Sequence, residues 1–259
     1  MTMPAALLNL AYGPEQRQKV DLFPAASAVP GKLVMHVHGG GWTTGGRGAG
    51  QKLARVLNPA GYAVAAMSYR LVPHTDVAGI MQDVARAAAF LMHGATRFNL
   101  DPDRFAVQGH SAGGHLAALL GADQTYLRGI GLDPAGLVGV LAMDGIFDVA
   151  VDLTQSPGKV DERVFGTDAA DWARYSPVHH LRDMQAHPRF GILHEDTRRR
   201  FAVQGELFAA ALRAQGEAFD LCVAPGLSHV DLMRLYGDSD YPIGAFALEF
   251  YAKAFAGKQ

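Results

Sequence analysis

The chain is poor in the residues that mark several large protein classes. One cysteine among 259 residues excludes an internal disulfide framework and a zinc site built from several cysteines. The 23 Lys and Arg residues nearly balance the 25 Asp and Glu residues, so no broad field attracts nucleic acid or an anionic membrane surface. The only basic cluster, Arg198-Arg199-Arg200, is short and predicts a solvated helix face.

Long hydrophobic runs are missing as well. No run approaches the roughly 18 apolar residues that a membrane-spanning helix needs. The first residues, Met1-Thr2-Met3-Pro4, show no basic region followed by an apolar stretch, so we expect no secretory signal and a cytoplasmic protein. Hydrophobic residues nevertheless make up 49% of the chain and charged residues 19%, which is the balance of a globular protein with a buried core. We expect one domain over residues 1–259.

Apolar runs of strand length alternate with segments in which apolar residues recur at helical spacing. This alternation is typical of an α/β protein whose mostly parallel sheet has helices on both faces. The predicted parallel strands are Leu33–Val37, Tyr62–Met67, Phe105–Gln108, Leu137–Met143, Phe190–His194 and Phe219–Val223, with Lys19–Phe23 as an antiparallel edge strand. Crossover helices are predicted around Ile80–Leu91 and Phe201–Leu212. Residues 148–188 fit neither pattern and form either a lid-like excursion from the sheet or ordinary surface packing.

A serine lies on a predicted sharp turn between a strand and a helix. The motif Gly109-His110-Ser111-Ala112-Gly113 follows the strand Phe105–Gln108 and precedes a helix-forming run. Such a serine has a strained backbone and an exposed hydroxyl, and glycines are needed where strand and helix pass close together. The helix N-terminus behind it favours developing negative charge. The motif therefore predicts that Ser111 is a nucleophile.

A glycine-rich loop precedes this turn in the chain. His38-Gly39-Gly40-Gly41-Trp42 directly follows the predicted strand Leu33–Val37. Consecutive glycines leave backbone N–H groups unobstructed, which suits them to bind an oxyanion. We expect the His38 ring to brace this loop by hydrogen bonding. Neither a carboxylate and histidine cluster with metal-ligand spacing nor a phosphate-binding loop is recognisable, so no metal and no other cofactor is expected.

These two glycine motifs carry a resemblance to a known family. Together with Ser68-Tyr69-Arg70-Leu71 and Asp101-Pro102-Asp103-Arg104, they resemble the α/β-hydrolase fold from about Lys19 to the end of the chain. Within that fold the chain resembles the hormone-sensitive-lipase-like carboxylesterases and their kynurenine formamidase relatives, with a reduced cap. The resemblance implies that Ser111 is the nucleophile. The oxyanion donors of the family match the backbone N–H groups of Gly40, Gly41 and Ala112.

The family order of the remaining catalytic residues is acid and then histidine. His229 lies in a loop after the last predicted strand, from which an imidazole can reach Ser111, and it is predicted as the base. We expect it to titrate near its ordinary value, roughly 6 to 7. Asp196 is predicted as the acid because it follows the strand Phe190–His194 and matches the family's usual aspartate. The neighbouring Glu195 is the alternative.

The sequence thus predicts a serine carboxylesterase that cleaves short-chain or small aromatic carboxylic esters through an acyl-enzyme. The predicted cleft is open and rimmed by Trp42, Tyr69 and Phe147. The segment Asp144-Gly145-Ile146-Phe147-Asp148 favours a kynurenine formamidase-like amide hydrolase as the alternative. A non-catalytic ligand-binding member of the fold is a third interpretation, against which the complete predicted triad argues. The expected partner is a small-molecule ester, with no nucleic acid and no membrane span, and a homodimer is left open.

Overall fold

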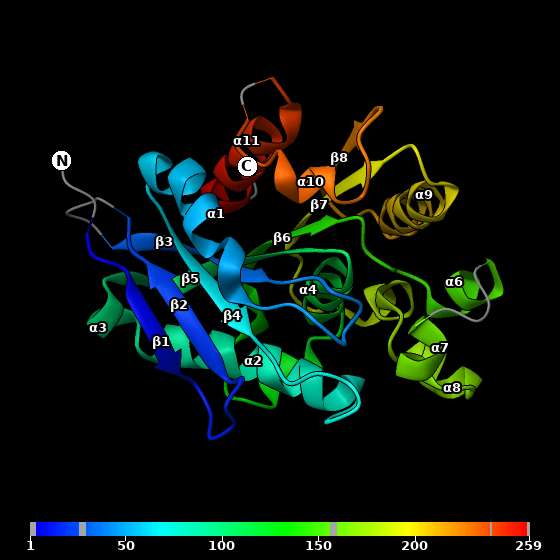
Figure 1. Cartoon of the computed structure of the whole chain (residues 1–259), viewed down its shortest axis with the longest axis horizontal. Helices are drawn as coiled ribbons and strands as arrows, with labels where there is room; N and C mark the ends of the chain where they lie inside the picture. The colour runs from blue at the N-terminus through cyan, green and yellow to red at the C-terminus, as the bar shows by residue number, and fades with distance from the viewer. Residues whose placement is uncertain (1–3, 26–29, 156–159, 239, 258–259) are drawn as a thin grey trace.

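An eight-stranded sheet in the order β1-β2-β4-β3-β5-β6-β7-β8 forms the centre of the molecule (Figure 1). The computed structural model describes residues 4–25, 30–155, 160–238 and 240–257. The strands are β1 (Leu7–Ala11), β2 (Lys19–Phe23), β3 (Gly31–Val37), β4 (Tyr62–Ser68), β5 (Leu100–His110), β6 (Leu137–Met143), β7 (Arg189–Glu195) and β8 (Phe219–Ala224). The six strands from β3 to β8 run parallel to one another, which confirms the predicted parallel strands.

The amino-terminal side of the sheet differs from the prediction in one respect. β2 pairs antiparallel with β4, as expected for Lys19–Phe23. It is not the edge strand, however, because β1 pairs with the free side of β2 and forms the edge of the sheet. β1 is largely exposed, and Leu7 and Leu8 keep 39% and 56% of their surface in contact with solvent. A strand without a buried face has no alternating pattern from which to predict it, and this explains why the sequence did not indicate β1.

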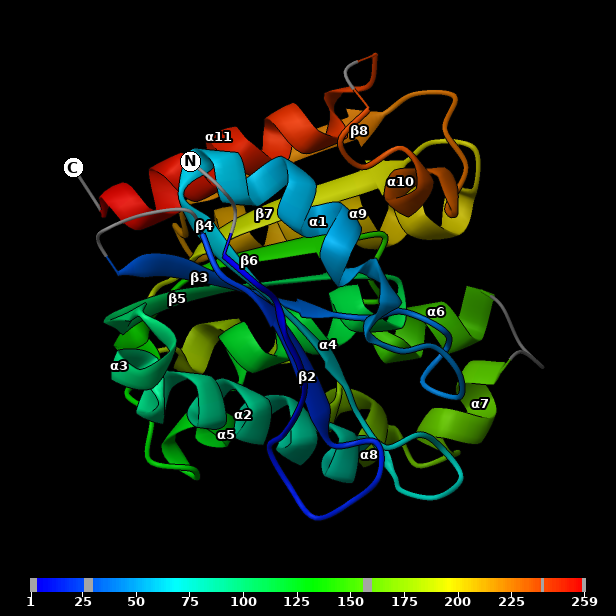
Figure 2. The ribbon, with the colours of Figure 1, turned by 60° about the vertical axis from the view of Figure 1, so that its left-hand side comes forward.

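Helices cover both faces of the sheet, as predicted (Figure 2). The longer helices are α1 (Gly50–Leu57), α2 (Val77–His93), α4 (Ala112–Ala122), α9 (Arg199–Ala214) and α11 (Pro242–Ala256), and the shorter ones are α3 (Ala95–Phe98), α5 (Thr125–Arg128), α6 (Val149–Gln155), α7 (Val160–Phe165), α8 (Ala169–Arg174) and α10 (Asp231–Arg234). Helices α1, α10 and α11 share one hydrophobic core with the sheet, whereas α2, α4 and α9 belong to the other. No described helix combines the length and apolarity needed to cross a bilayer.

Local sequence explains the two best-predicted elements. Helix α2 begins after Asp76, whose carboxylate accepts a hydrogen bond from the Gly79 backbone N–H at 2.8 Å, and this contact caps the helix. Its residues Ile80, Val84 and Leu91 are fully buried, because they lie on one face at helical spacing. All seven residues of β4 are buried, as expected for a parallel strand covered by helices on both sides.

The segment of residues 148–188 leaves the sheet between β6 and β7, and part of it lies outside the described residues. Its described portion contains α6, α7 and α8 and no strand. Gln204 of α9 fixes its start, because the Gln204 Oε1 atom accepts hydrogen bonds from the backbone N–H groups of Phe147 and Asp148 at 2.7 and 2.9 Å. Farther along, the Phe165 ring lies 4.9 Å from that of Trp42. The excursion therefore packs on both α9 and the glycine-rich loop.

The parallel topology brings the chemistry-bearing segments to one edge of the sheet. The glycine-rich loop follows β3, the serine turn follows β5, Asp144 follows β6, and the His229 loop follows β8. All four therefore lie at the carboxyl ends of parallel strands, where open α/β sheets hold their ligands.

Candidate active site

Ser111 lies on the sharp turn between β5 and α4, in the strained conformation that the motif predicts. Its φ and ψ are 59° and -124°, a region that side-chain-bearing residues rarely adopt. A Cβ atom on Gly109 would lie 2.0 Å from the Gly113 carbonyl oxygen, and one on Gly113 would lie 2.0 Å from the Val37 carbonyl oxygen. Glycine is therefore required at both positions. The Ser111 N–H donates to the Met143 carbonyl at 2.8 Å, which ties the turn to β6.

The glycine-rich loop lies directly against this serine. A Cβ atom built on Gly39 would come within 3.2 Å of the Ser111 Cβ atom. Gly40 and Gly41 both have positive φ, at 116° and 56°, so the loop turns in a way that residues with side chains disfavour. Ala112 is the first residue of α4, and its N–H group has no acceptor within the helix. The three predicted oxyanion donors thus come from two segments that meet at Ser111.

His38 and Tyr69 brace the loop from behind. Their rings stack at 4.1 Å and 7° between planes, the Tyr69 hydroxyl donates to the His38 carbonyl at 2.9 Å, and the His38 Nδ1–H donates to the Gly39 carbonyl at 2.7 Å. This confirms the bracing role predicted for His38. Burial lowers the pKa of His38 to about 4, so the ring acts as a neutral donor.

The predicted open rim is wrong, because the structure buries all three of its aromatic residues. Trp42, Tyr69 and Phe147 keep 2%, 0% and 1% of their surface exposed. The Trp42 indole N–H donates to His115 Nδ1 at 3.2 Å, and Phe147 stacks on Phe208 of α9 at 4.5 Å. These three aromatic rings pack in the core. The sequence alone cannot distinguish an aromatic residue that packs in the core from one that contacts substrate.

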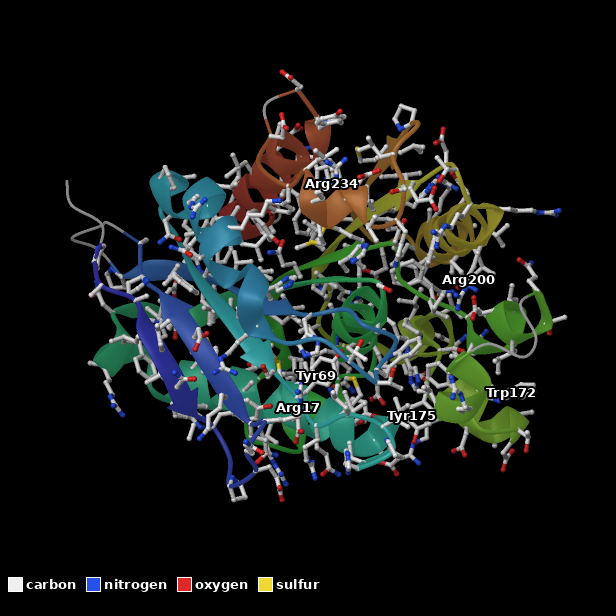
Figure 3. The ribbon with its side chains drawn as sticks, viewed as in Figure 1. Arg17, Tyr69, Trp172, Tyr175, Arg200 and Arg234 are labelled. Atoms are coloured by element: carbon white, nitrogen blue, oxygen red, sulfur yellow. The ribbon has the colours of Figure 1, made fainter. Side chains whose placement is uncertain are left out.

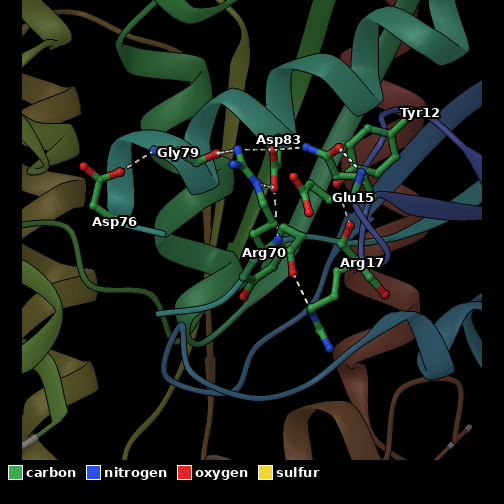
Figure 4. A network of polar contacts seen from close by, with 10 residues as sticks. Tyr12, Glu15, Arg17, Arg70, Asp76, Gly79 and Asp83 are labelled. Carbon is green, nitrogen blue, oxygen red and sulfur yellow. Dashed lines mark hydrogen bonds and ion pairs between the residues drawn. The ribbon is translucent and has the colours of Figure 1, made fainter. Parts of the chain in front are cut away.

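A buried ion pair fixes the chain that carries Tyr69. Asp83 of α2 is fully buried, and its carboxylate accepts hydrogen bonds from the Arg70 guanidinium at 2.7 and 2.9 Å and from the Gln18 amide at 2.7 Å (Figure 4). Arg17 Nε donates to the Tyr69 carbonyl at 2.8 Å. Because a buried carboxylate is costly unless its oxygens are satisfied, this network favours one position for the chain just after β4.

His229 reaches the serine turn from the loop after β8, and its carboxylate partner is Asp144. The His229 Nδ1 atom lies 2.8 Å from Asp144 Oδ2, and the Asp144 side chain is fully buried. Asp144 Oδ1 accepts the backbone N–H of Glu195 at 2.9 Å. The Nε2 atom of His110, which immediately precedes Ser111, donates to the His229 carbonyl at 2.7 Å, so the histidine loop is tied directly to the turn.

The predicted contact between Asp196 and His229 is wrong. Asp196 Oδ1 instead accepts the Gly226 backbone N–H at 2.8 Å, so this carboxylate holds the histidine loop rather than the histidine ring. The alternative, Glu195, turns its Oε2 atom toward the backbone N–H groups of Thr197 and Arg198 at the start of α9. Glu195 is the last residue of β7 and Asp196 follows it, and β7 lies one strand farther than β6 from the serine strand β5.

A sequence signal for Asp144 was available. It directly follows the predicted strand Leu137–Met143, just as Asp196 follows its own strand, and it preserves the order serine, acid, histidine. What separates the two carboxylates is strand order. In this structure the carboxylate after β6 bonds the His229 ring, whereas the carboxylates of Glu195 and Asp196 bond backbone N–H groups.

Two further rings enclose the His229 imidazole. The Phe201 ring stacks on it at 4.1 Å and 2° between planes, and the His110 ring lies at 4.3 Å and 36°. The same region holds the one described group with the donor set of a metal site: His110, Asp144 and His229 offer ligand atoms within 4.8 Å of one another. Hydrogen bonds already engage His110 Nε2 and Asp144 Oδ2, so this donor set is that of a hydrogen-bonded network.

Burial changes the protonation of these groups. It is the largest cause of a lowered pKa for His229, and the nearby Arg198 cation lowers that pKa further. The expectation that His229 titrates near its ordinary value is therefore wrong. Burial also raises the pKa of Asp144 and lowers the pKa of His110. Each shift disfavours the charged form of its group.

The arginine cluster at the start of α9 is only partly a solvated face. Arg198 and Arg199 are exposed, as predicted. Arg200 lies between α9 and α6 (Figure 3) and forms two 2.6 Å hydrogen bonds to Asp152, whose side chain is 1% exposed. The third arginine thus joins α9 to the excursion.

Comparison with known proteins finds relatives that are named as methylesterases. The chain is 25% identical over 242 residues to the Probable isoprenylcysteine alpha-carbonyl methylesterase of Oryza sativa subsp. japonica, a match that covers 86% of this chain and 57% of the relative. It is 30% identical over 111 residues to an isoprenylcysteine alpha-carbonyl methylesterase of Arabidopsis thaliana, covering 42% of this chain and 26% of the relative. The chain therefore spans between about a quarter and somewhat more than half of these curated relatives.

Solved structures and a family model agree on the fold. Esterase B from Lactobacillus rhamnosis superposes with a TM-score of 0.83 at 22% identity, over 97% of this chain and 85% of that protein. A truncated carbohydrate esterase from gut microbiota superposes with a TM-score of 0.79 at 16% identity, over 99% of this chain and 98% of that protein. The BD-FAE family model matches residues 21–153, just over half of the chain. The chain thus has the predicted α/β-hydrolase fold and belongs to the BD-FAE family.

Proposed function

We propose that this protein is a carboxylic ester hydrolase that works through an acyl-enzyme, with Ser111 as nucleophile, His229 as base and Asp144 as the acid. The observation that carries the proposal is the 2.8 Å hydrogen bond between His229 and the buried Asp144, next to a serine in a strained turn. A nucleophile, a base and a group that orients the base are the three parts that acyl transfer requires. The names of the similar proteins, methylesterase and esterase, agree with this chemistry.

The hydrogen bonds set the direction of proton transfer. His229 donates its Nδ1–H to Asp144, so its Nε2 atom is unprotonated and takes the proton of the Ser111 hydroxyl as the oxygen attacks the ester carbonyl carbon. The oxyanion that forms accepts hydrogen bonds from backbone N–H groups, which cost no reorganisation because the turn and the helix N-terminus already fix them. These donors are Gly40, Gly41 and Ala112.

The second half of the reaction reverses these roles. The His229 imidazolium returns its proton to the departing alkoxide, and the alcohol leaves an acyl group on the Ser111 oxygen. Water then loses a proton to His229 as it attacks the acyl carbon, and the carboxylic acid is released with Ser111 restored. The Asp144 carboxylate accepts the His229 Nδ1–H in both steps and stabilises the imidazolium, and the hydrogen bond from the Glu195 backbone N–H favours its charged form against the effect of burial.

We propose short-chain or small aromatic esters as substrates. Packed rings fill the space between the glycine-rich loop and the excursion. The centre of the Trp42 ring lies 5.4 Å from that of His115 and 4.9 Å from that of Phe165. Phe165 in turn contacts Tyr175 at 6.1 Å. A long acyl chain would have to displace these buried rings, whereas a short one would not.

The test combines labelling with turnover. A fluorophosphonate probe should label Ser111, and the protein should hydrolyse p-nitrophenyl butyrate faster than it hydrolyses the amide N-formylaniline. Ser111→Ala should abolish labelling and reduce kcat by at least about 10³-fold while the protein stays folded, because the hydroxyl fills little core volume. Faster turnover of the formanilide would instead support the formamidase alternative. A folded protein that neither reacts with the probe nor hydrolyses either substrate would refute the proposal.

A further inference from the structure

Two rings from different parts of the chain hold the His229 imidazole between them. Phe201, at the start of α9, lies parallel to it at 4.1 Å, and His110, at the end of β5, lies against it at 4.3 Å. The Phe201 side chain is only 5% exposed. Neither ring can exchange a proton with Ser111 through these contacts, so Phe201 affects the imidazole only through packing and exclusion of water.

Phe201 is itself held by polar contacts on both sides of it in the chain. Arg200 is bonded twice to the buried Asp152 of α6, and its guanidinium lies 5.5 Å from the centre of the Phe201 ring. One turn later, Gln204 bonds the backbone at Phe147 and Asp148. The first turns of α9 are therefore fixed to the excursion, and the position of the Phe201 ring with them.

We propose that Phe201 is a positioning residue for His229, held in place by the Arg200–Asp152 pair, and that it keeps the imidazole oriented between Asp144 and Ser111. This inference rests on the proposed function, because it assigns a role in the same reaction. A flat ring in parallel contact leaves the imidazole free to slide but opposes its rotation about the Cβ–Cγ bond. Rotation would break the hydrogen bond to Asp144 and turn Nε2 away from the nucleophile.

The ring also controls how much water reaches the imidazole. The titratable and charged groups around His229 are Asp144 at the end of β6, Glu195 at the end of β7, His110 at the end of β5, and Arg198 and Arg200 on α9. A smaller side chain at position 201 leaves these charges in place but admits water to one face of the ring. Water solvates an imidazolium better than a benzene face does, so the pKa of His229 should rise.

Phe208 offers a matched control. It lies on the same helix, is fully buried, and stacks on Phe147 at 4.5 Å and 9° between planes. Phe208→Leu therefore removes one ring from a parallel stack in the same core, but that stack does not include His229. Phe201→Tyr is the conservative variant, because it keeps the ring.

The experiment compares kcat, KM and the acid limb of the pH profile on p-nitrophenyl butyrate for Phe201→Leu, Phe208→Leu and Phe201→Tyr. We expect Phe201→Leu to lower kcat about tenfold with little change in KM and to move the acid limb upward, since orientation of the base matters most in the transition state. Phe208→Leu should lower Tm but leave kcat and the acid limb unchanged. Phe201→Tyr should retain most of the wild-type kcat, because it keeps the ring. The proposal would be overturned if Phe201→Leu kept the wild-type kcat and acid limb. Equal losses of kcat in Phe201→Leu and Phe208→Leu would overturn it as well.

A second measurement separates this inference from the proposed function. The ¹⁵N resonances of His229, assigned by their loss in His229→Gln, report its pKa whether or not any ester is hydrolysed. Phe201→Leu should raise that pKa and Phe208→Leu should not. If the resonances titrate identically in wild type and Phe201→Leu, the positioning role fails even in an active esterase. If the pKa shifts but the wild type hydrolyses no ester, the contact is real and the proposed reaction is wrong.

Discussion

The Nδ1 atom of His229 lies 2.8 Å from Oδ2 of Asp144, although 85 positions separate the two residues in the chain. Asp144 follows β6, the strand beside the serine strand, whereas Asp196 follows β7, one strand farther away, and bonds the backbone of the loop that carries His229. The histidine is thus positioned by two carboxylates, one acting on its ring and the other on its loop.

Asp144→Asn should reduce kcat by about 10³- to 10⁴-fold, because an amide cannot hold the imidazole in the required tautomer or stabilise its charge. Asp196→Asn should cost less than about tenfold, since the asparagine oxygen can still accept the Gly226 N–H. Steady-state kinetics on p-nitrophenyl butyrate, with circular dichroism to verify folding, would compare the two. A greater loss of kcat in Asp196→Asn or in Glu195→Gln than in Asp144→Asn would show that the catalytic acid lies at the end of β7.

The enzyme should remain active at pH values below the ordinary pKa of histidine. Catalysis needs neutral His229, and burial together with Arg198 lowers its pKa, so the neutral form persists to lower pH. We expect the acid limb of kcat/KM to have its midpoint below about 6.5.

Arg198→Gln should move this midpoint upward by about 0.3 to 0.7 pH unit, because a positive charge no longer opposes protonation of the imidazole. The neighbouring exposed Arg199 provides the control, and Arg199→Gln should leave the limb where it is. High salt should reduce the difference between the two variants. A downward shift in Arg198→Gln would contradict this electrostatic assignment.

The acyl-chain preference should depend on Phe165. In the wild-type protein we expect kcat/KM on p-nitrophenyl esters to be highest between acetate and about hexanoate, since each further methylene gains at most about 0.8 kcal/mol and only where a wall covers it. Phe165→Ala removes a ring that packs on Trp42 at 4.9 Å and should shift the maximum to longer chains. Phe255→Ala, which removes a ring near Tyr62 in the opposite core, should not. A wild-type maximum at dodecanoate or beyond would show that the packed rings do not limit the acyl pocket.

Asp83→Asn should lower the free energy of unfolding by about 2 kcal/mol, because the Arg70 guanidinium, which is 25% exposed, loses its charged and fully buried partner. Glu249→Gln removes one partner of the pair between Lys253 and Glu249, where the glutamate side chain is 67% exposed. That variant should change the free energy by less than about 0.5 kcal/mol. Urea unfolding of both variants would measure the difference, and similar values would mean that the Asp83 network contributes little to stability.

The local sequence was sufficient for the elements whose chemistry is local. Gly109 is required by a backbone approach within the turn itself and Gly113 by the approach of α4 to the end of β3. Both glycines belong to a short motif, and the glycine-rich loop follows its strand directly, so both motifs could be recognised without a structure. The parallel strands could be predicted because burial on both faces demands continuous apolar runs. The His229 position followed from chain order and loop setting.

Tertiary structure decided which partners those residues meet. Asp144, Glu195 and Asp196 all lie at the carboxyl ends of parallel strands, and the assembled sheet brings Asp144 to the imidazole while Asp196 bonds the loop that carries it. The use of Trp42, Tyr69 and Phe147 in the core, and of Phe201 against His229, likewise depends on contacts between segments far apart in the chain. Sequence patterns report periodicity and backbone requirements over short stretches, whereas side-chain partners across strands and helices are set by how the whole sheet assembles.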